Sequence, residues 1–427
     1  MKKGNVNGAL QLLTNNMKNG ILPLNDATIQ TLRQKHPKSK PASYEVMLPD
    51  TPRSVHPIIY ENITADTIKR AAMKTKGGSG PSSMDSDGWR RMLLSNSFGN
   101  SSNELCQAIS RVSQKLYQQE QLYSTIEPLL ACRLIPVDKN PGLRPIGVGE
   151  VLRRIIGKAV ASITRESITK SVGSLQVCAG HDAGCEAAIH SMKDIFADED
   201  TEAVLLIDAA NAFNSINREA FLHNIKVICP EIAIFVSNCY AKSSRLFVIG
   251  GIEISSAEGT TQGDPMAMAI YAVAIIPLLL MVLQITDQLP GKTKSEAYAD
   301  DFTAAGSLEN LKLWWKHLSR LGPLFGYYPE ETKCWLIVKP QYFKKSKEVF
   351  SDTKIKITTD GKRHIGAVIG TERYKTEFVD EKTKTWCDEL RLLCKIAEIE
   401  PHAAYTCFVS GFKHKLTFTM RTIPDIK

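Results

Sequence analysis

Runs of apolar residues that end at charged or turn-forming residues divide the chain into short predicted strands and helices. The run Ala203–Ile207 is apolar throughout and is followed by Asp208, a pattern typical of a buried strand that ends at the protein surface. The segment around Tyr298 leads directly into Asp300 and Asp301, which predicts a hairpin with two acids at its tip. Asp also forms turns through local hydrogen bonds, so a plain polar turn is the alternative for this pair.

Similar signals elsewhere give the remaining predicted elements. The sequence predicts hairpins at residues 134–149 (around Asn140-Pro141-Gly142) and 244–255 (around Gly250-Gly251), helices beginning near Asn217 and at residues 308–322, and a strand at Cys334–Val338. Strands and helices follow one another without regular strand–helix–strand alternation. This order predicts an α+β fold built from several subdomains.

One long apolar stretch allows two interpretations. Residues from Met266 to Leu283 carry no charge, and about 18 apolar residues suffice for a candidate membrane span. Pro277 lies in the middle of the stretch, and no second stretch of this kind exists. A helix that is apolar all round is also typical of the core of a large protein. We therefore expect a buried helix and no membrane partner.

Composition and charge narrow the class of protein. The chain has 427 residues, of which 43% are apolar and 23% are charged, so two or three subdomains of ordinary globular composition are expected. The formal net charge of +8 suits a polyanionic partner without requiring one. Ten cysteines with no C-x-x-C pair, and an N-terminus without a signal-peptide core, favour an intracellular protein of the cytoplasm or nucleus.

The two predicted strand ends suggest a metal site. If the strand before Asp208 neighbours the hairpin of Asp300 and Asp301, three carboxylates meet at one point. Mg²⁺ takes oxygen ligands and commonly combines one or two carboxylates with substrate phosphates. Two such ions about 3.5–4 Å apart can serve an in-line phosphoryl transfer.

A phosphate-handling site also needs cations. Lys139 and Arg144 flank the turn of the hairpin at residues 134–149, so both can point from one tip. Lysine meets phosphate as a point charge and arginine as a bidentate fork. The alternative is a solvated, charged hairpin end without a ligand.

The segments RLIPVDKNPGLRPIGVG, LLIDAANAF, GTTQGDP and AYADD occur in this order. Together they resemble the consecutive motifs of the reverse transcriptase family, most closely the polymerase region of non-LTR retrotransposons, over roughly residues 75 to 370. The resemblance implies a right-hand fold of fingers, palm with an antiparallel sheet, and thumb. It implies RNA-templated DNA synthesis from dNTPs on a DNA primer.

The resemblance assigns roles to the acids and cations. It implies that Asp208 and Asp300 are the main metal ligands and Asp301 the third acid, with Mg²⁺, or Mn²⁺ in its place, as the cofactor. It also implies that Lys139 and Arg144 hold the incoming triphosphate.

Further roles follow from the same resemblance. Gln262 and Gly263 would line the nucleotide and template pocket, and Lys333 would lie close to the leaving pyrophosphate. The hairpin around His364 is similar to the primer grip. Phe213, five positions after Asp208, would place its ring against the sugar and exclude a ribose 2′-hydroxyl. The alternative for Phe213 is a plain core residue.

The expected subdomains are an N-terminal extension (residues 1–75), fingers (76–202), palm (203–345), and palm end with a partial thumb (346–427). RNA-templated RNA synthesis is one alternative function, and an inactive nucleic-acid-binding fragment is another. Whether the chain is a whole protein or part of a polyprotein stays open.

Two other features are interpreted as structural. Zinc ligand types occur at Cys178, His181, Cys185 and His190, but their spacing departs from the usual zinc pairings. Buried thiols on an Ala-rich helix are the favoured interpretation. Trp314 and Trp315 are expected to pack on a helix with partial exposure rather than to stack on bases.

Overall fold

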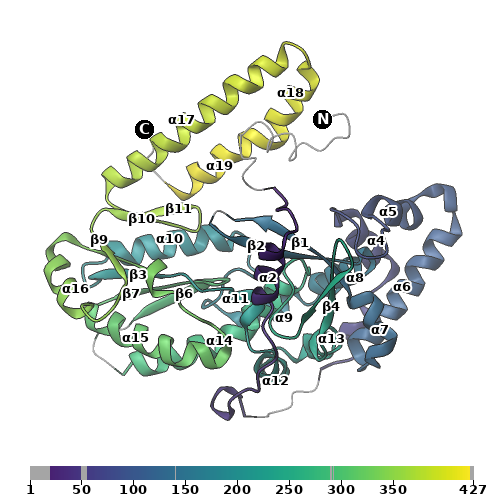
Figure 1. Cartoon of the computed structure of the whole chain (residues 1–427), viewed down its shortest axis with the longest axis horizontal. Helices are drawn as coiled ribbons and strands as arrows, with labels where there is room; N and C mark the ends of the chain where they lie inside the picture. Colours follow the sequence, from purple (N-terminus) through teal and green to yellow (C-terminus); the bar gives the residue numbers. More distant parts are fainter. Residues whose placement is uncertain (1–19, 50–54, 140, 289–290, 292, 424–427) are drawn as a thin grey trace.

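The computed structural model describes residues 20–49, 55–139, 141–288, 291 and 293–423, and Figure 1 shows how their elements are arranged. The helices of the N-terminal half are α2 (Asp26–Lys35), α3 (Ile58–Glu61), α4 (Ala65–Lys74), α5 (Ser86–Leu94), α6 (Asn100–Gln118), α7 (Tyr123–Leu130), α8 (Val151–Ile163), α9 (Arg165–Val172) and α10 (Gly184–Ala197). Those that follow are α11 (Ala212–Ser215), α12 (Arg218–Ile228), α13 (Pro230–Tyr240), α14 (Ala267–Thr286), α15 (Leu308–Leu321), α16 (Phe343–Val349), α17 (Glu372–Ala397), α18 (Pro401–Cys407) and α19 (Lys413–Thr422).

A five-stranded sheet forms the centre of the molecule. Its strands, in spatial order, are β6 (Lys294–Tyr298), β7 (Asp301–Gly306), β3 (Ala203–Ile207), β8 (Trp335–Val338) and β9 (Lys356–Thr358). Strand β3 pairs antiparallel with both β7 and β8. All its residues except Leu206 are buried, as expected for a central strand covered on both faces.

Helix α14 lies against this sheet region and is the long apolar stretch of the sequence. It contacts α9, α12 and α15, and two thirds of its most apolar window is buried inside the protein. It is the one helix among the described residues that is long and apolar enough to span a membrane. Its apolar surface is therefore used in the core, as the sequence predicts.

A four-stranded sheet lies beside the central one (Figure 1). Its order is β2 (Leu143–Gly149), β1 (Cys132–Asp138), β4 (Ser244–Val248) and β5 (Ile252–Ser256). The two predicted hairpins supply these strands, although Asn140 lies outside the described residues. Strand β4 pairs in parallel with β1. This sheet therefore combines strands from the expected fingers (76–202) with strands from the expected palm (203–345).

The N-terminal part of the described chain forms an extended strap, residues 20–48, that contains α2. At its start, the Leu22 amide donates to the Pro136 carbonyl of β1 over 2.9 Å. Further along, the Leu48 amide donates to Oδ1 of Asn224 in α12, also over 2.9 Å. The Pro-rich segment therefore satisfies its backbone groups with side chains of the body rather than with regular secondary structure.

The C-terminal part begins with the hairpin of β10 (Gly361–His364) and β11 (Ala367–Gly370). Helices α17, α18 and α19 follow, and Figure 1 shows them projecting away from the two larger sheets. A π-helical turn, Phe408–Phe412, joins α18 to α19.

Most predicted elements are confirmed at close to their predicted limits. Strand β3 and helix α12 begin and end where the pattern places them, and Asn217 caps α12 by accepting from the Ala220 amide over 2.8 Å. Trp314 and Trp315 pack on helix α15 as predicted, but the expected partial exposure is wrong, because both side chains are buried.

Glu296 of β6 provides a test of how α10 packs on the five-stranded sheet. Its side chain is 7% exposed beneath α10, and its Oε1 has no hydrogen-bond partner among the described residues. Burial raises the pKa of Glu296 to about 7, so the folded protein keeps a proton that the unfolded chain releases at lower pH. Stability contributed by this group is present at pH 4 and is lost as the pH rises through 7. We therefore predict that Glu296→Gln raises the free energy of unfolding at pH 8 by about 2–3 kcal/mol.

Urea denaturation of wild type and variant at pH 5 and pH 8 measures this effect. The difference should shrink towards pH 5, and exposed Glu199→Gln should show no such pH-dependent gain. An equal effect at both pH values would contradict the assignment.

Candidate active site

Three carboxylates lie together at one end of the central sheet. Ile207, the last residue of β3, is paired with Phe302 of β7, so Asp208 and Asp301 follow side by side. Tyr298 is paired with Asp301, which leaves Asp300 in the two-residue turn between β6 and β7. The convergence that the sequence predicts from two similar strand ends is therefore present in the structure.

The backbone of this turn is held from two sides. Ala299 has a φ of 58°, a left-handed conformation that is unusual for a residue other than glycine. The buried Gln176 side chain bonds it twice: its Oε1 accepts from the Ala299 amide (2.8 Å) and its Nε2 donates to the Ala299 carbonyl (2.9 Å). The Tyr327 hydroxyl donates to the Asp300 carbonyl over 3.0 Å. These contacts stabilise a strained turn that presents the acids.

The three acids are close enough to repel one another when they are ionised. Burial, together with the charges of Asp300 and Asp208, raises the pKa of Asp301 to about 7. Burial also raises the pKa of Asp300, against the opposing influence of Lys139 and Arg144. Asp301 is exposed, so solvent screens part of the repulsion among the acids. A bound cation would relieve the repulsion in each case.

A cavity of about 430 Å³ opens on one side of the acids. Six residues predicted from the sequence line it: Lys139, Arg144, Phe213, Gln262, Gly263 and Asp300. They come from the β1–β2 hairpin, helix α11 after β3, the loop before α14 and the acid turn. The fold therefore joins four separate motifs around one space.

The Gln262-Gly263 loop packs directly on strand β2. The Gly147 amide donates to the Gln262 carbonyl over 2.8 Å. Gly263 has a φ of +116°, and a Cβ at this position would lie 2.4 Å from the Gly147 carbonyl oxygen. No larger residue fits this approach, which explains the glycine of the QGDP segment.

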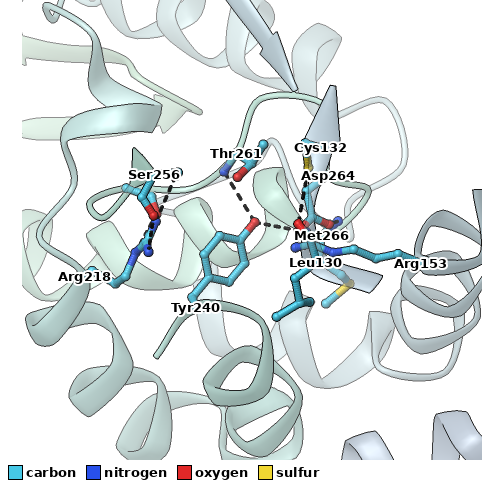
Figure 2. Close-up of polar contacts among 10 residues, drawn as sticks. Leu130, Cys132, Arg153, Arg218, Tyr240, Ser256, Thr261, Asp264 and Met266 are labelled. Atoms are coloured by element: carbon cyan, nitrogen blue, oxygen red, sulfur yellow. Dashed lines mark hydrogen bonds and ion pairs between the residues drawn. The ribbon is translucent and has the colours of Figure 1, made fainter. Parts of the chain in front are cut away.

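A buried polar network anchors the residue after this glycine (Figure 2). The Asp264 carboxylate forms an ion pair with Arg153 and accepts from the Tyr240 hydroxyl over 2.6 Å. Arg153 also donates to the Leu130 carbonyl, and the Met266 amide donates to Asp264. Burial alone would lower the pKa of Arg153, but the adjacent Asp264 carboxylate raises it well above its ordinary value. The cavity wall is thus connected to helices α8 and α13.

Phe213 forms another part of this wall. Its ring stacks on Tyr271 of α14 with 4.5 Å between the ring centroids. Its carbonyl accepts from the Thr260 amide over 2.6 Å. The half-buried ring is thereby fixed at the edge of the cavity rather than enclosed in the core.

A second cavity, of about 350 Å³, opens on the other side of the acids. Asp208, Asp301 and Lys333 line it, together with a basic and aromatic group consisting of Trp335, Lys356, Lys362, Arg363 and His364. The Lys362 and Lys356 ammonium groups lie 4.0 and 5.3 Å from the Trp335 ring centroid. Cations and a ring in this arrangement suit a nucleic-acid backbone.

Comparison with known protein families gives one match. The family model described as reverse transcriptase (RNA-dependent DNA polymerase) matches residues 137–359, more than half of the chain. The chain belongs to the reverse transcriptase family. Among curated proteins, none matches it. The match contains three of the four motifs completely and the first motif from Val137 onward. The expected likeness of residues 75–136 and 360–370 stays a prediction.

Reverse transcriptases generally use Mg²⁺ or Mn²⁺. The donor atoms of the three acids can be compared with the ligands that these ions prefer. Among the residues that the structure describes, no group of three or more His, Cys, Asp or Glu side chains is close enough to hold a metal ion by itself. The three acids supply only hard oxygen donors, and Mg²⁺ usually completes its shell with substrate phosphates and water. The donor set therefore fits Mg²⁺ that binds together with a nucleotide.

Lys333 lies apart from the other two predicted cations. Its ammonium donates to Glu330 over 2.6 Å, and it lines the second cavity rather than the one that contains Lys139. Its charge still lowers the pKa of Lys35, which lines the first cavity. The predicted contact of Lys333 with pyrophosphate stays a prediction.

The Cys and His residues considered for zinc bind separate partners. His181 contacts the Gly173 carbonyl over 2.9 Å, whereas His190 contacts the Arg421 carbonyl over 2.8 Å. The Cys185 thiol donates to the Ile365 carbonyl. The expected burial of the thiols is wrong, because Cys178 and Cys185 are only partly buried, and Cys178 lies before α10.

Several residues of the site do not emerge from the sequence pattern. Lys35 and Asn211 line the first cavity, Gln176 holds the acid turn, and Arg153 and Tyr240 anchor the QGDP loop. Only Arg153 leaves a readable signal, because it interrupts the apolar face of α8 and is buried there.

Proposed function

We propose that the protein is an RNA-directed DNA polymerase of retrotransposon origin, of the non-LTR kind. It would add deoxynucleotides to the 3′-hydroxyl of a DNA primer paired with an RNA template. The observation that carries this proposal is the position of the three acids between two different cavities. One cavity has the size, cations and aromatic edge that suit a nucleotide, and the other has the basic and aromatic lining that suits a primer strand.

The right-hand architecture fits the arrangement of the elements. The five-stranded sheet with α14 would be the palm, and the four-stranded sheet with α4–α8 would be the fingers. Helices α17–α19 would form the thumb, and the β10–β11 hairpin, which reaches the second cavity at His364, would be the primer grip.

The three acids and the cations of the first cavity would act by binding and orientation. Asp208, Asp300 and Asp301 would hold Mg²⁺, which when bound stabilises charge on the attacking and leaving oxygens. Lys139 and Arg144 would bind the triphosphate. The 3′-hydroxyl then attacks the α-phosphate, and pyrophosphate leaves.

Primer extension on poly(rA)·oligo(dT) with Mg²⁺ tests the proposal. We expect purified protein to lengthen the primer with dTTP and to require a divalent ion. Preferential use of UTP would favour an RNA polymerase, and tight binding of the duplex without extension would favour an inactive binding fragment.

Phe213 provides a specific prediction about substrate choice. Its ring stacks on Tyr271 at the edge of the first cavity, and in the proposed binding mode it would collide with a ribose 2′-hydroxyl. We predict that Phe213→Ala lowers the preference for dNTPs over NTPs by roughly 10- to 100-fold, because a steric pocket of this kind rejects an added hydroxyl by about that factor.

The ratio of kcat/KM for dTTP and UTP measures this preference. Phe247→Ala, which removes a partly exposed ring from β4, is the matched control. An unchanged ratio in Phe213→Ala would mean that the ring serves packing alone.

A further inference from the structure

The strap brings Lys35, a cation outside the matched family region, into the first cavity. Lys35 is the last residue of α2 and lines this cavity together with Lys139, Arg144 and Asp300. It lies far from these residues in sequence, and its presence there depends on the path of the strap. Figure 1 shows α2 between β2 and α11, at the junction of the two larger sheets.

The position of Lys35 is fixed by contacts on both sides. Leu32, one turn earlier, is fully buried in an apolar cluster with side chains of the four-stranded sheet, including Leu134 and Leu246. The Lys35 carbonyl accepts from Nδ2 of Asn211, three residues after Asp208, over 2.9 Å. Asn211 also lines the cavity and holds a left-handed φ of 54°. The lysine is therefore built into the site rather than attached to a free tail.

The contacts of the strap continue beyond Lys35. Nδ2 of Asn217 donates to the Lys40 carbonyl over 3.0 Å, and the Ala42 amide donates to Glu219 over 2.9 Å. These bonds come from the start of α12, directly after helix α11, which carries Phe213. The strap is thus held to the start of α12 directly after Lys35 has entered the cavity.

Three cations, Lys35, Lys139 and Arg144, line the first cavity. In the described part of the chain, no carboxylate lies within ion-pair distance of Lys35, Lys139 or Arg144. Burial lowers the pKa of Lys35, the charges of Lys139 and Lys333 lower it further, and the charge of Glu330 opposes this shift. A polyanion bound between the three cations would relieve their mutual repulsion.

We propose that Lys35 is a third triphosphate-binding residue, contributed by the strap to the cavity of Lys139 and Arg144. This inference rests on the proposed function, because it assumes that the cavity receives a nucleoside triphosphate. The ammonium of Lys35 would meet phosphate oxygens in the same cavity as the side chains of Lys139 and Arg144. The strap is then part of the substrate site and not only a covering segment.

Steady-state primer extension with Lys35→Gln tests this assignment. We expect the KM for dTTP to rise on the order of 10- to 100-fold, the effect of losing a charge-assisted hydrogen bond, while kcat changes little. Lys35→Arg should restore KM to within about threefold of wild type, since it keeps the charge. Lys38→Gln removes an exposed charge from the same strap and should leave KM unchanged.

Calorimetric titration provides a readout that does not depend on turnover. Wild type should bind dTTP with Mg²⁺ more tightly than Lys35→Gln does, and thymidine should bind both proteins equally weakly. Melting curves confirm that both proteins are folded.

Each outcome separates the two proposals. If the wild-type protein extends primers and Lys35→Gln leaves the KM for dTTP unchanged, the role of Lys35 is overturned and the polymerase proposal stands. An equal rise of KM in Lys38→Gln has the same meaning. Weaker primer–template binding with an unchanged KM overturns it in favour of a nucleic-acid contact. Binding of dTTP through Lys35 without any extension overturns the polymerase and supports the triphosphate site.

Discussion

Asp300→Asn is expected to lower primer extension by about a thousandfold or more, while the protein remains folded. The variant keeps the shape of the side chain and removes the charge that would hold Mg²⁺, whose stabilisation of reacting oxygens contributes several kcal/mol. Asp208→Asn should have the same effect, because Asp208 lies beside Asp301 at the end of the adjacent strand. Extension of an RNA-templated primer measures both losses.

Asp300→Asn should not lower the thermal stability of the protein, although it lowers activity. Burial and the nearby charge of Asp208 raise the pKa of Asp300, so its ionised form disfavours the folded state without a cation. The melting temperature of Asp300→Asn in the absence of divalent ions should therefore equal or exceed that of wild type. Exposed Asp287→Asn is the control and should extend primers normally. Full activity in both Asp208→Asn and Asp300→Asn would refute the catalytic site.

Arg153→Met is expected to lower the free energy of unfolding by about 3–5 kcal/mol, because it leaves the Asp264 carboxylate buried without its ion-pair partner. The KM for dTTP should also rise, since the QGDP loop loses one of its anchors (Figure 2). Urea denaturation and steady-state kinetics measure the two effects.

A double variant separates charge from packing. Arg153→Met with Asp264→Asn should be more stable than Arg153→Met alone, because the unpaired charge is gone. Arg154→Met is the matched control: its guanidinium contacts the Lys76 and Gly78 carbonyls at the surface, and its loss should change stability by less than about 1 kcal/mol. Equal losses in the Arg153 and Arg154 variants would contradict a special role for the buried pair.

Local pattern is sufficient to predict the elements that present the acids. Strand β3 is an uninterrupted apolar run, and the hairpin of β6 and β7 has alternating residues around a turn. Asp208 and Asp301 each lie at one end of an apolar strand. If the two strands are neighbours in one sheet, these ends lie at the same edge, so the two acids could be predicted to meet. The lining of the first cavity followed from the resemblance of the motifs rather than from periodicity.

The supporting residues could not be predicted in this way. Arg153 and Asp264 are 111 positions apart, and Gln176 holds a turn 123 positions later. Nothing in the local sequence identifies the partner of a buried polar side chain. Lys35 was missed for a related reason: the strap after it has little regular structure, and side chains of the body determine its path.

The strap also has a consequence for movement. It is bonded to β1 at one end and to α12 at the other, so it spans the boundary between the two larger sheets. Any rotation of one sheet towards the other must displace this tether or stretch it. Under the proposed function, movements that admit substrate or release product would therefore also displace a segment outside the region matched by the family model.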